Sequence, residues 1–279
     1  MDQAAPAVQT IETSDSVISY RDLGEGPVIL LLHGGGPGAT GWGNFSGNAA
    51  DLASKFRVIV PDQPGFGASR LVKDSGATYH TVSAQTMAEF LGILGIFRAH
   101  IVGNSMGGGV ALRMAMQRPD LVDKLVLMGP WIPGFGIPLL APLPVPLLQE
   151  YYPDPTPEKM RLLIKSMVYA PTFENFDELV TSRYAASIDP DIAAGYARMG
   201  TGTDPDPDPR PMWDQVAAIP HETLLLWGRD DRHCSLDDAF QYLAAMRNSQ
   251  LMIFRQTGHW VQVEQRQAFA KHVTAFLAD

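Results

Sequence analysis

The chain has 279 residues, and its 46% hydrophobic and 18% charged residues are typical of a folded globular protein rather than a disordered one. Its formal net charge of -9 at pH 7 argues against a nucleic-acid or anionic-membrane partner, since either would favour a basic surface. A single cysteine, no metal-type Cys/His spacing, no secretory signal pattern and no apolar run of membrane-spanning length predict a soluble, cytoplasmic protein without a bound metal.

Short apolar runs that predict β-strands alternate along the chain with segments compatible with helices. The apolar runs are continuous rather than alternating in hydrophobicity, as expected of strands covered on both faces. This order predicts an open α/β sheet with right-handed crossovers, in which ligands bind beyond the carboxyl ends of the strands. The strand-like runs are 27–34, 57–65, 100–105, 124–130, 223–231 and 251–259, and the helical segments are 79–95, 106–118, 236–247 and 264–278.

The alternation is interrupted between residues 131 and 213. This segment begins with a stretch too rich in proline for a continuing helix, and the helical patterns "EKMRLLIKSMVYA" and "FDELVTSRYAASI" follow. It closes with "TDPDPDPRP", which favours an extended linker and is either a surface loop or a hinge. Because strand-like sequence resumes at 223, we interpret 131–213 as a helical lid inserted into a core domain of residues 1–130 and 214–279.

Ser105 lies in the pattern Gly103-x-Ser105-x-Gly107, between a strand-like run and a helical segment. This context is typical of a nucleophile elbow, a sharp turn that lifts a catalytic hydroxyl above the sheet. Glycine is expected two positions to either side, because a side chain there would collide with the neighbouring strand and helix. We therefore predict that Ser105 is a nucleophile; an ordinary Gly/Ser turn is the less favoured alternative.

A serine nucleophile needs a base and a carboxylate that orients the base, and on this fold they follow the serine in the order acid, then histidine. Of seven histidines, His259 alone follows the last strand-like run in a loop; His233 is the main rival but shares a loop with the candidate acids. Between those acids we favour Asp231 over Asp230, since the later position is better placed to turn toward the histidine. Asp62 precedes the serine and is more simply a turn residue.

The stretch "LLHGGGPG" places several glycines directly after the first strong strand-like run. Glycine lets a backbone N–H approach a substrate oxygen closely, and an HGGG-type loop supplies one donor of the oxyanion hole on this fold. We expect the N–H groups of Gly35 and Met106 to form that hole. A phosphate-binding loop is disfavoured because neither G-x-G-x-x-G nor GK[ST] is present, and a simple tight turn is the other alternative.

Together these stretches resemble the meta-cleavage product hydrolases, which cleave carbon–carbon bonds in bacterial aromatic and steroid ring degradation. The resemblance implies an α/β-hydrolase fold with a mostly parallel central sheet, helices on both faces and an inserted lid. It also implies a triad of Ser105, Asp231 and His259, no cofactor, and a homo-oligomer of two or more chains. The stretches that carry it are "LLHGGGPGATGWGNFSGN", "VPDQPGFGAS", "IVGNSMGGGVAL", "KLVLMGP", "LLLWGRDDRHCSLDD" and "GHWVQVE".

The same resemblance implies a substrate, a 2-hydroxy-6-oxo-hexa-2,4-dienoate with a variable substituent at carbon 6. Its carboxylate would be bound by Arg183 from the lid, since a guanidinium suits a planar carboxylate. From the residues alone, Arg183 is more simply an exposed helix residue, Trp260 a core residue and Asn104 a turn-fixing amide. The lid has "GPWIPGFG" where relatives often carry a glycine pair after "GP". The preference of the relatives for a particular substituent at carbon 6 is therefore not assigned to this chain. Residues that match others around the dienoate are Gly36, Asn44, Asn104 and Trp260.

The expected reaction gives 2-hydroxypenta-2,4-dienoate and a carboxylic acid, through ketonisation with His259 as proton carrier and then attack at carbon 6. Both an acyl-Ser105 intermediate and direct attack by water are compatible with the sequence. A lidded esterase or thioesterase could use the same triad, but a simple ester needs no carboxylate-binding arginine. A non-catalytic small-molecule receptor is disfavoured by the complete triad pattern. A haloalkane dehalogenase or an epoxide hydrolase would carry aspartate in place of Ser105.

Overall fold

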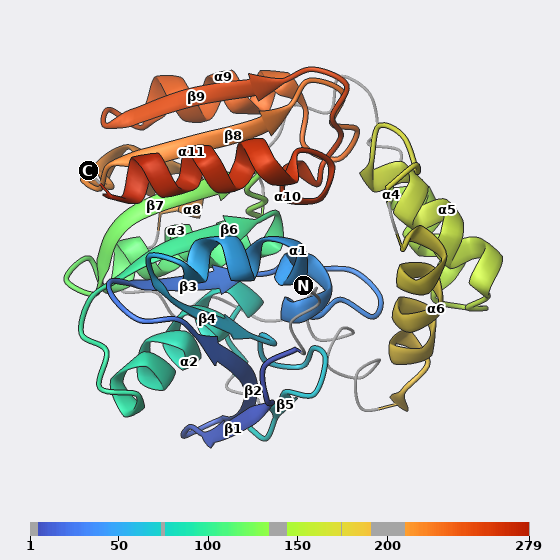
Figure 1. Ribbon diagram of the computed structural model, residues 1–279, viewed down its shortest axis with the longest axis horizontal. Coiled ribbons are helices and arrows are strands. Elements are labelled where there is room, and N and C mark those ends of the chain that lie inside the picture. The colour runs from blue at the N-terminus through green and yellow to red at the C-terminus, as the bar shows by residue number, and fades with distance from the viewer. Residues whose placement is uncertain (1–4, 74–75, 134–143, 174, 191–209, 279) are drawn as a thin grey trace.

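The computed structural model describes residues 5–73, 76–133, 144–173, 175–190 and 210–278, and within them nine strands form one sheet (Figure 1). The order across the sheet is β1-β2-β4-β3-β6-β7-β8-β9, with the short β5 paired to β2. The strands from β4 to β9 in this order are parallel, and β1, β2 and β5 join antiparallel. Their bounds are β1 Gln9–Glu12, β2 Ser16–Leu23, β3 Val28–Leu32, β4 Arg57–Pro61, β5 Arg70–Leu71, β6 Ala99–Asn104, β7 Val122–Met128, β8 Thr223–Gly228 and β9 Ser249–Phe254.

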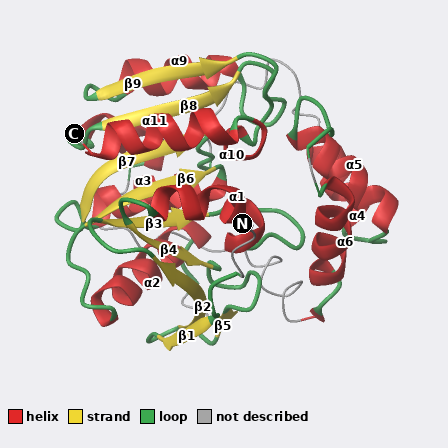
Figure 2. Ribbon diagram, in the orientation of Figure 1, coloured by secondary structure: helices red, strands yellow, loops and turns green. Residues whose placement is uncertain are grey.

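Helices cover both faces of this sheet (Figure 2). One hydrophobic core joins the sheet to α2, α3 and α9, and a second core on the opposite face joins it to α1, α10 and α11. The predicted fold class, an α/β-hydrolase type with a mostly parallel sheet, is therefore confirmed. The bounds are α1 Gly41–Ala53, α2 Tyr79–Ile93, α3 Met106–Gln117, α8 Met212–Gln215 followed by a 3₁₀ turn at Val216–Ala218, α9 Leu236–Ala245, α10 Val261–Glu264 and α11 Arg266–Ala278.

The continuous hydrophobicity of the central strands follows from their position between two cores. In β3, Ile29 and Leu31 belong to one core, while Leu30 and Leu32 belong to the other, and all four are fully buried. Because successive side chains of a strand point to opposite faces, a strand covered twice needs apolar residues at every position. The six predicted strand-like runs coincide with β3, β4, β6, β7, β8 and β9.

In the described part of the chain, three of the helices between β7 and β8 form a separate layer next to the sheet. They are α4 (Pro144–Tyr151), α5 (Pro157–Met167) and α6 (Phe176–Ser187), and they lie beyond the arrowheads of β8 and β9 in Figure 1. A third hydrophobic cluster holds them together and includes Trp260 from the core part of the chain. The proline-rich opening does contain a short helix, α4, because its prolines fall in the first turn, where their missing N–H is not needed. The "DPDPDP" segment lies outside the described residues.

In the described part of the chain, no helix combines the length and the apolar character needed to cross a membrane.

Candidate active site

The turn at Ser105 has the geometry of a nucleophile elbow. Ser105 lies between β6 and α3 with φ 53, a conformation that non-glycine residues rarely adopt. A Cβ on Gly103 would lie 2.5 Å from the Gly107 carbonyl oxygen in the helix, and a Cβ on Gly107 would lie 2.2 Å from the Leu32 carbonyl oxygen in β3. Both clashes involve backbone atoms, so only glycine fits, as the sequence predicted.

His259 and Asp231 are paired at the carboxyl ends of the last two strands. His259 Nδ1 lies 2.8 Å from Asp231 Oδ2, and both side chains are only 2% exposed. Since a carboxylate only accepts hydrogen bonds, Nδ1 carries the proton and Nε2 keeps its lone pair, which is the tautomer that a general base needs. Asp230 instead bonds through its backbone N–H to the Thr257 carbonyl at 2.9 Å. The structure thus joins His259 to Asp231 and not to Asp230.

The other carboxylate oxygen of Asp231 is held by its own loop. The backbone N–H groups of His233 and Cys234 donate to Asp231 Oδ1 at 2.8 and 3.0 Å. The Cys234 carbonyl in turn accepts from the Trp227 indole at 3.0 Å. One oxygen of the acid is therefore fixed by the backbone, which leaves the other oxygen to orient His259.

Asn104 connects the elbow to the histidine loop. Its fully buried amide donates to the Met128 carbonyl at 3.2 Å and to the His259 carbonyl at 3.3 Å. The turn-fixing interpretation of Asn104 agrees with these contacts. Within the described residues no hydrogen bond joins the Ser105 and His259 side chains, although Asn104 brings their two loops into contact.

The glycine loop after β3 lies next to the elbow. The Gly34 N–H donates to Asn44 Oδ1 at 3.4 Å, and the Asn44 amide donates to the Thr40 carbonyl at 3.2 Å. In the described part of the chain, the predicted oxyanion donors, the N–H groups of Gly35 and Met106, donate to no protein acceptor. Two N–H groups on adjoining turns, beside a helix N-terminus, can stabilise a developing oxyanion.

His33 holds this loop as a neutral imidazole. Its Nδ1 lies 2.8 Å from the Gly34 carbonyl oxygen, and its Nε2 accepts from the Gln63 N–H at 2.9 Å. The first partner only accepts and the second only donates, so the proton is on Nδ1. Complete burial lowers the pKa of His33 to about 4, with a further lowering contribution from Arg183.

His33 is expected to make folding acid-sensitive. The pKa of His33 is lowered from 6.5 in the unfolded chain to about 4 in the folded protein. Between these two pH values the unfolded chain is protonated at His33 and the folded protein is not, so the free energy of unfolding falls as the pH decreases from 6.5 to 4. The loss amounts to about 3 kcal/mol at pH 4. We expect His33→Gln to be less stable than the wild type at pH 7, with the gap shrinking toward pH 4 in urea unfolding. A gap independent of pH would contradict this assignment.

Arg183 is buried rather than exposed. It lies on α6 with 6% of its surface exposed, donates from Nε to the Pro37 carbonyl at 3.2 Å, and stacks its guanidinium over the Trp260 ring at 5.2 Å. A Cβ on Gly36, whose φ is 106, would lie 3.4 Å from Arg183 Nη2. The exposed-helix interpretation of Arg183 is therefore wrong, because α6 packs this face onto the glycine loop. A guanidinium beside the oxyanion loop can bind an anionic part of a substrate.

A small apolar pocket lies beneath α5 and α6. Its volume is about 10 Å³, close to the minimum for one water molecule. A much larger concavity of about 980 Å³ lies between α2 and α3 and contains none of the predicted site residues, so size alone does not identify this active site. The small pocket is lined by Pro37, Met160, Leu163, Ile164, Met167, Arg183 and Trp260.

The end of α5 is attached to the loop that carries His259. The His259 N–H donates to the Met167 carbonyl at 2.7 Å. The carboxylate of Glu264 accepts from the Gly258 N–H with one oxygen and from the Tyr169 N–H with the other, both at 2.7 Å. Sequence reasoning did not identify Glu264, although it lies within the stretch "GHWVQVE"; an acidic residue beside the histidine loop was the available signal. Burial raises the pKa of Glu264, and its backbone donors oppose that shift.

Asp62 has structural partners. Asp62 accepts from the N–H groups of Gly41 and Ala68 at 2.7 and 2.9 Å, which confirms it as a turn residue. In the described ranges no cluster of three or more His, Cys, Asp or Glu side chains is arranged to hold a metal ion.

These residues lie together on an α/β fold, and the chain belongs to the alpha/beta hydrolase family, whose model matches residues 29–272. It is 35% identical to a 2-hydroxy-6-oxo-6-phenylhexa-2,4-dienoate hydrolase of Comamonas testosteroni, over 95% of this chain and 93% of that one. It is 36% identical to a 2-hydroxy-6-oxononadienedioate/2-hydroxy-6-oxononatrienedioate hydrolase of Escherichia coli (strain K12 / DH10B), over 94% and 91% of the two chains.

This chain is also similar to a solved structure of a protein with the same name as one of these relatives. The 2-hydroxy-6-oxo-6-phenylhexa-2,4-dienoate hydrolase from Rhodococcus sp. strain RHA1 matches with a TM-score of 0.85 and 29% identity, over 98% of this chain and all of that one (100%). The resemblance to the meta-cleavage product hydrolases is therefore confirmed.

Proposed function

We propose that this protein hydrolyses a carbon–carbon bond in a 2-hydroxy-6-oxo-hexa-2,4-dienoate, giving 2-hydroxypenta-2,4-dienoate and a carboxylic acid. The observation that carries the proposal is the buried Arg183 guanidinium, which lies against the Gly36 turn and stacks on Trp260, the residue that follows His259. A simple ester requires no such cation, whereas the dienoate has a carboxylate at one end and an electrophilic ketone at the other. The names of the curated relatives support the same substrate class.

The carboxylate is bound by Arg183, and the ketone at carbon 6 lies over Ser105. Gly36, Asn44 and Trp260 surround the dienoate end. Gly36 lies against the Arg183 guanidinium, Trp260 stacks on it, and Asn44 fixes the loop from which Gly35 donates. Asn104 acts through its bonds to the His259 and Met128 carbonyls, which set the position of the elbow.

The reaction begins with a change of tautomer. His259 takes the proton of the 2-hydroxyl group and returns a proton to carbon 5, so the enol becomes a ketone. This step is needed because direct cleavage would expel an unstabilised carbanion, whereas cleavage of the keto form expels an enolate stabilised by the carbon-2 carbonyl.

Cleavage follows from attack at carbon 6. His259 takes the proton of the attacking hydroxyl, and the Gly35 and Met106 N–H groups stabilise the oxyanion. The bond between carbons 5 and 6 breaks, its electron pair goes to the dienoate fragment, and that fragment gains a proton. With Ser105 as the attacking group the product is an acyl-serine, which water hydrolyses. Asp231 keeps the His259 tautomer throughout.

We expect the purified protein to bleach the visible absorbance of a 6-phenyl dienoate and to release benzoate. We expect Arg183→Gln to raise KM for the dienoate about 100-fold, because a charge-assisted bond is lost, while hydrolysis of a neutral p-nitrophenyl ester stays nearly unchanged. Arg161→Gln is the matched control, since Arg161 pairs with Asp177 on the outer side of the inserted helices. Ester cleavage without any dienoate cleavage would identify an esterase instead.

The same proposal includes the organisation and location of the protein. Residues 131–213 act as a lid on a core domain of residues 1–130 and 214–279, supported by the separate cluster that α4, α5 and α6 form. A homo-oligomeric, cytoplasmic enzyme that needs no cofactor and recognises neither nucleic acid nor membrane is consistent with the acidic composition and the lone cysteine.

A further inference from the structure

We propose that His233 is a positioning residue for the reaction, which holds the His259 imidazole by stacking on its face and is itself held by Ser166 of α5. The inference rests on the proposed function of His259 as the base. It assigns a role to two residues, His233 and Ser166, that neither the triad nor the substrate contacts use.

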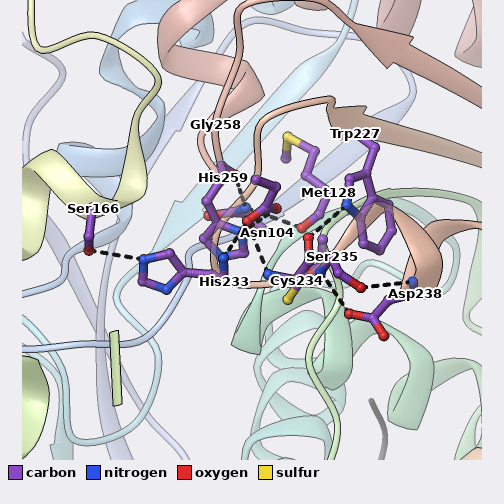
Figure 3. A network of polar contacts seen from close by, with 12 residues as sticks. Asn104, Met128, Ser166, Trp227, His233, Cys234, Ser235, Asp238, Gly258 and His259 are labelled. Carbon is purple, nitrogen blue, oxygen red and sulfur yellow. Dashed lines mark hydrogen bonds and ion pairs between the residues drawn. The ribbon is translucent and has the colours of Figure 1, made fainter. Parts of the chain in front are cut away.

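The two imidazoles lie face to face. Their ring centroids are 4.9 Å apart and their planes differ by 17° (Figure 3). His259 is fixed along one edge by the bond from Nδ1 to Asp231, but that bond alone leaves the ring free to rock about it. A flat partner against one face of the ring removes this freedom, so His233 completes the restraint on His259.

His233 is itself held from two sides. Its backbone N–H donates to Asp231 Oδ1 at 2.8 Å, and its ring Nε2 lies 3.1 Å from Ser166 Oγ. The Ser166 hydroxyl has one proton, which it donates to the Leu163 carbonyl at 2.6 Å. His233 must therefore donate from Nε2 to Ser166, which fixes the orientation of the ring.

The charge state of His233 suits this role. Burial lowers the pKa of His233 well below its ordinary value, and the neighbouring His259 and Arg232 lower it further, against a raising contribution from Ser166. The carboxylate of Asp231 also adjoins the loop. A neutral His233 presents a π face to His259, and such a face is compatible with the positive charge that His259 gains during the reaction. A charged His233 would repel it.

The test compares three variants, His233→Ala, His233→Phe and Ser166→Ala. The interaction of a stacked aromatic pair is equivalent to about a tenfold change in a rate constant. We therefore expect kcat of His233→Ala to fall about tenfold, with KM little changed. His233→Phe keeps a flat ring and should restore most of kcat. Ser166→Ala should fall about threefold, and combining it with His233→Ala should cost nothing more, because both act through one contact chain. Ser182→Ala is the matched control, since the Ser182 hydroxyl donates to the Leu179 carbonyl within its own helix.

Two further measurements separate this inference from the proposed function. The rate at which a fluorophosphonate labels Ser105 reports on His259 without requiring a dienoate, and it should follow kcat across the variants. Thermal unfolding should show that all variants are folded. The inference would be overturned if His233→Ala matched the wild type in labelling rate and in kcat. It would also be overturned if His233→Phe were as slow as His233→Ala, or if the acidic limb of the kcat–pH profile of His233→Phe were shifted. A labelled wild type that cleaves no dienoate would overturn only the proposed function.

Discussion

Replacing Ser105 by alanine is expected to lower turnover of the dienoate by a factor on the order of 10⁴, and His259→Ala should cost about as much. Ser105 supplies the attacking oxygen and His259 moves the protons, so the two residues act as a unit and their losses do not add. The measurement is the single-turnover decay of the dienoate absorbance, with the double variant included.

The two variants should differ in one informative respect. If His259 also drives the change of tautomer, Ser105→Ala should still form the keto intermediate, while His259→Ala should accumulate the unreacted enol. Alanine fits at position 105 without new clashes, because the strained φ of 53 is already carried by a side-chain residue. A Ser105→Ala variant that cleaves the dienoate at nearly the wild-type rate would exclude Ser105 as the nucleophile and favour attack by water.

Asp231→Asn is expected to lower kcat by a factor on the order of 10³ to 10⁴. The asparagine oxygen can keep the bonds from His233 and Cys234, so the loop should hold its shape. Its amide group would then face His259 Nδ1 and donate to it, which forces the proton onto Nε2 and removes the lone pair that the serine needs. The fold is preserved while the base is lost.

Asp230→Asn is the matched control for this change. It alters a neighbouring carboxylate whose backbone, not its side chain, bonds to Thr257. We expect turnover within about threefold of the wild type, in line with an ordinary surface substitution. Steady-state kinetics of both variants on one dienoate decide the assignment, and the reverse order of effects would transfer the role of the acid to Asp230.

The candidate site could be predicted from the sequence because its key residues follow strand-like runs. The ends of β3, β6, β8 and β9 carry the glycine loop, Ser105, Asp231 and His259, and parallel strands bring such ends to one edge. The choice between Asp230 and Asp231 was weaker, because both carboxylates follow the same strand. Only the turn of the chain after β8 decides which one faces the histidine.

Other features had no signal of their own in the sequence. Helix α1 was not predicted, since its glycines weaken any helical pattern; it forms because Phe45 and Leu52 pack into the core. Glycine is required at position 41, where a Cβ would lie 2.3 Å from the Pro61 carbonyl oxygen. Ser166 is another such residue, because its partner, His233, is distant in the chain and only the folding of the inserted helices brings the two together.

The attachment of α5 to the histidine loop has a consequence for how substrate gains entry. A space of about 10 Å³ cannot admit a dienoate, so we expect the helices around it to move apart when substrate binds beside Arg183. Met167 fastens the carboxyl end of α5 to His259, and moving that end would disturb the base. Substrate entry is therefore expected to leave the carboxyl end of α5 in place beside His259.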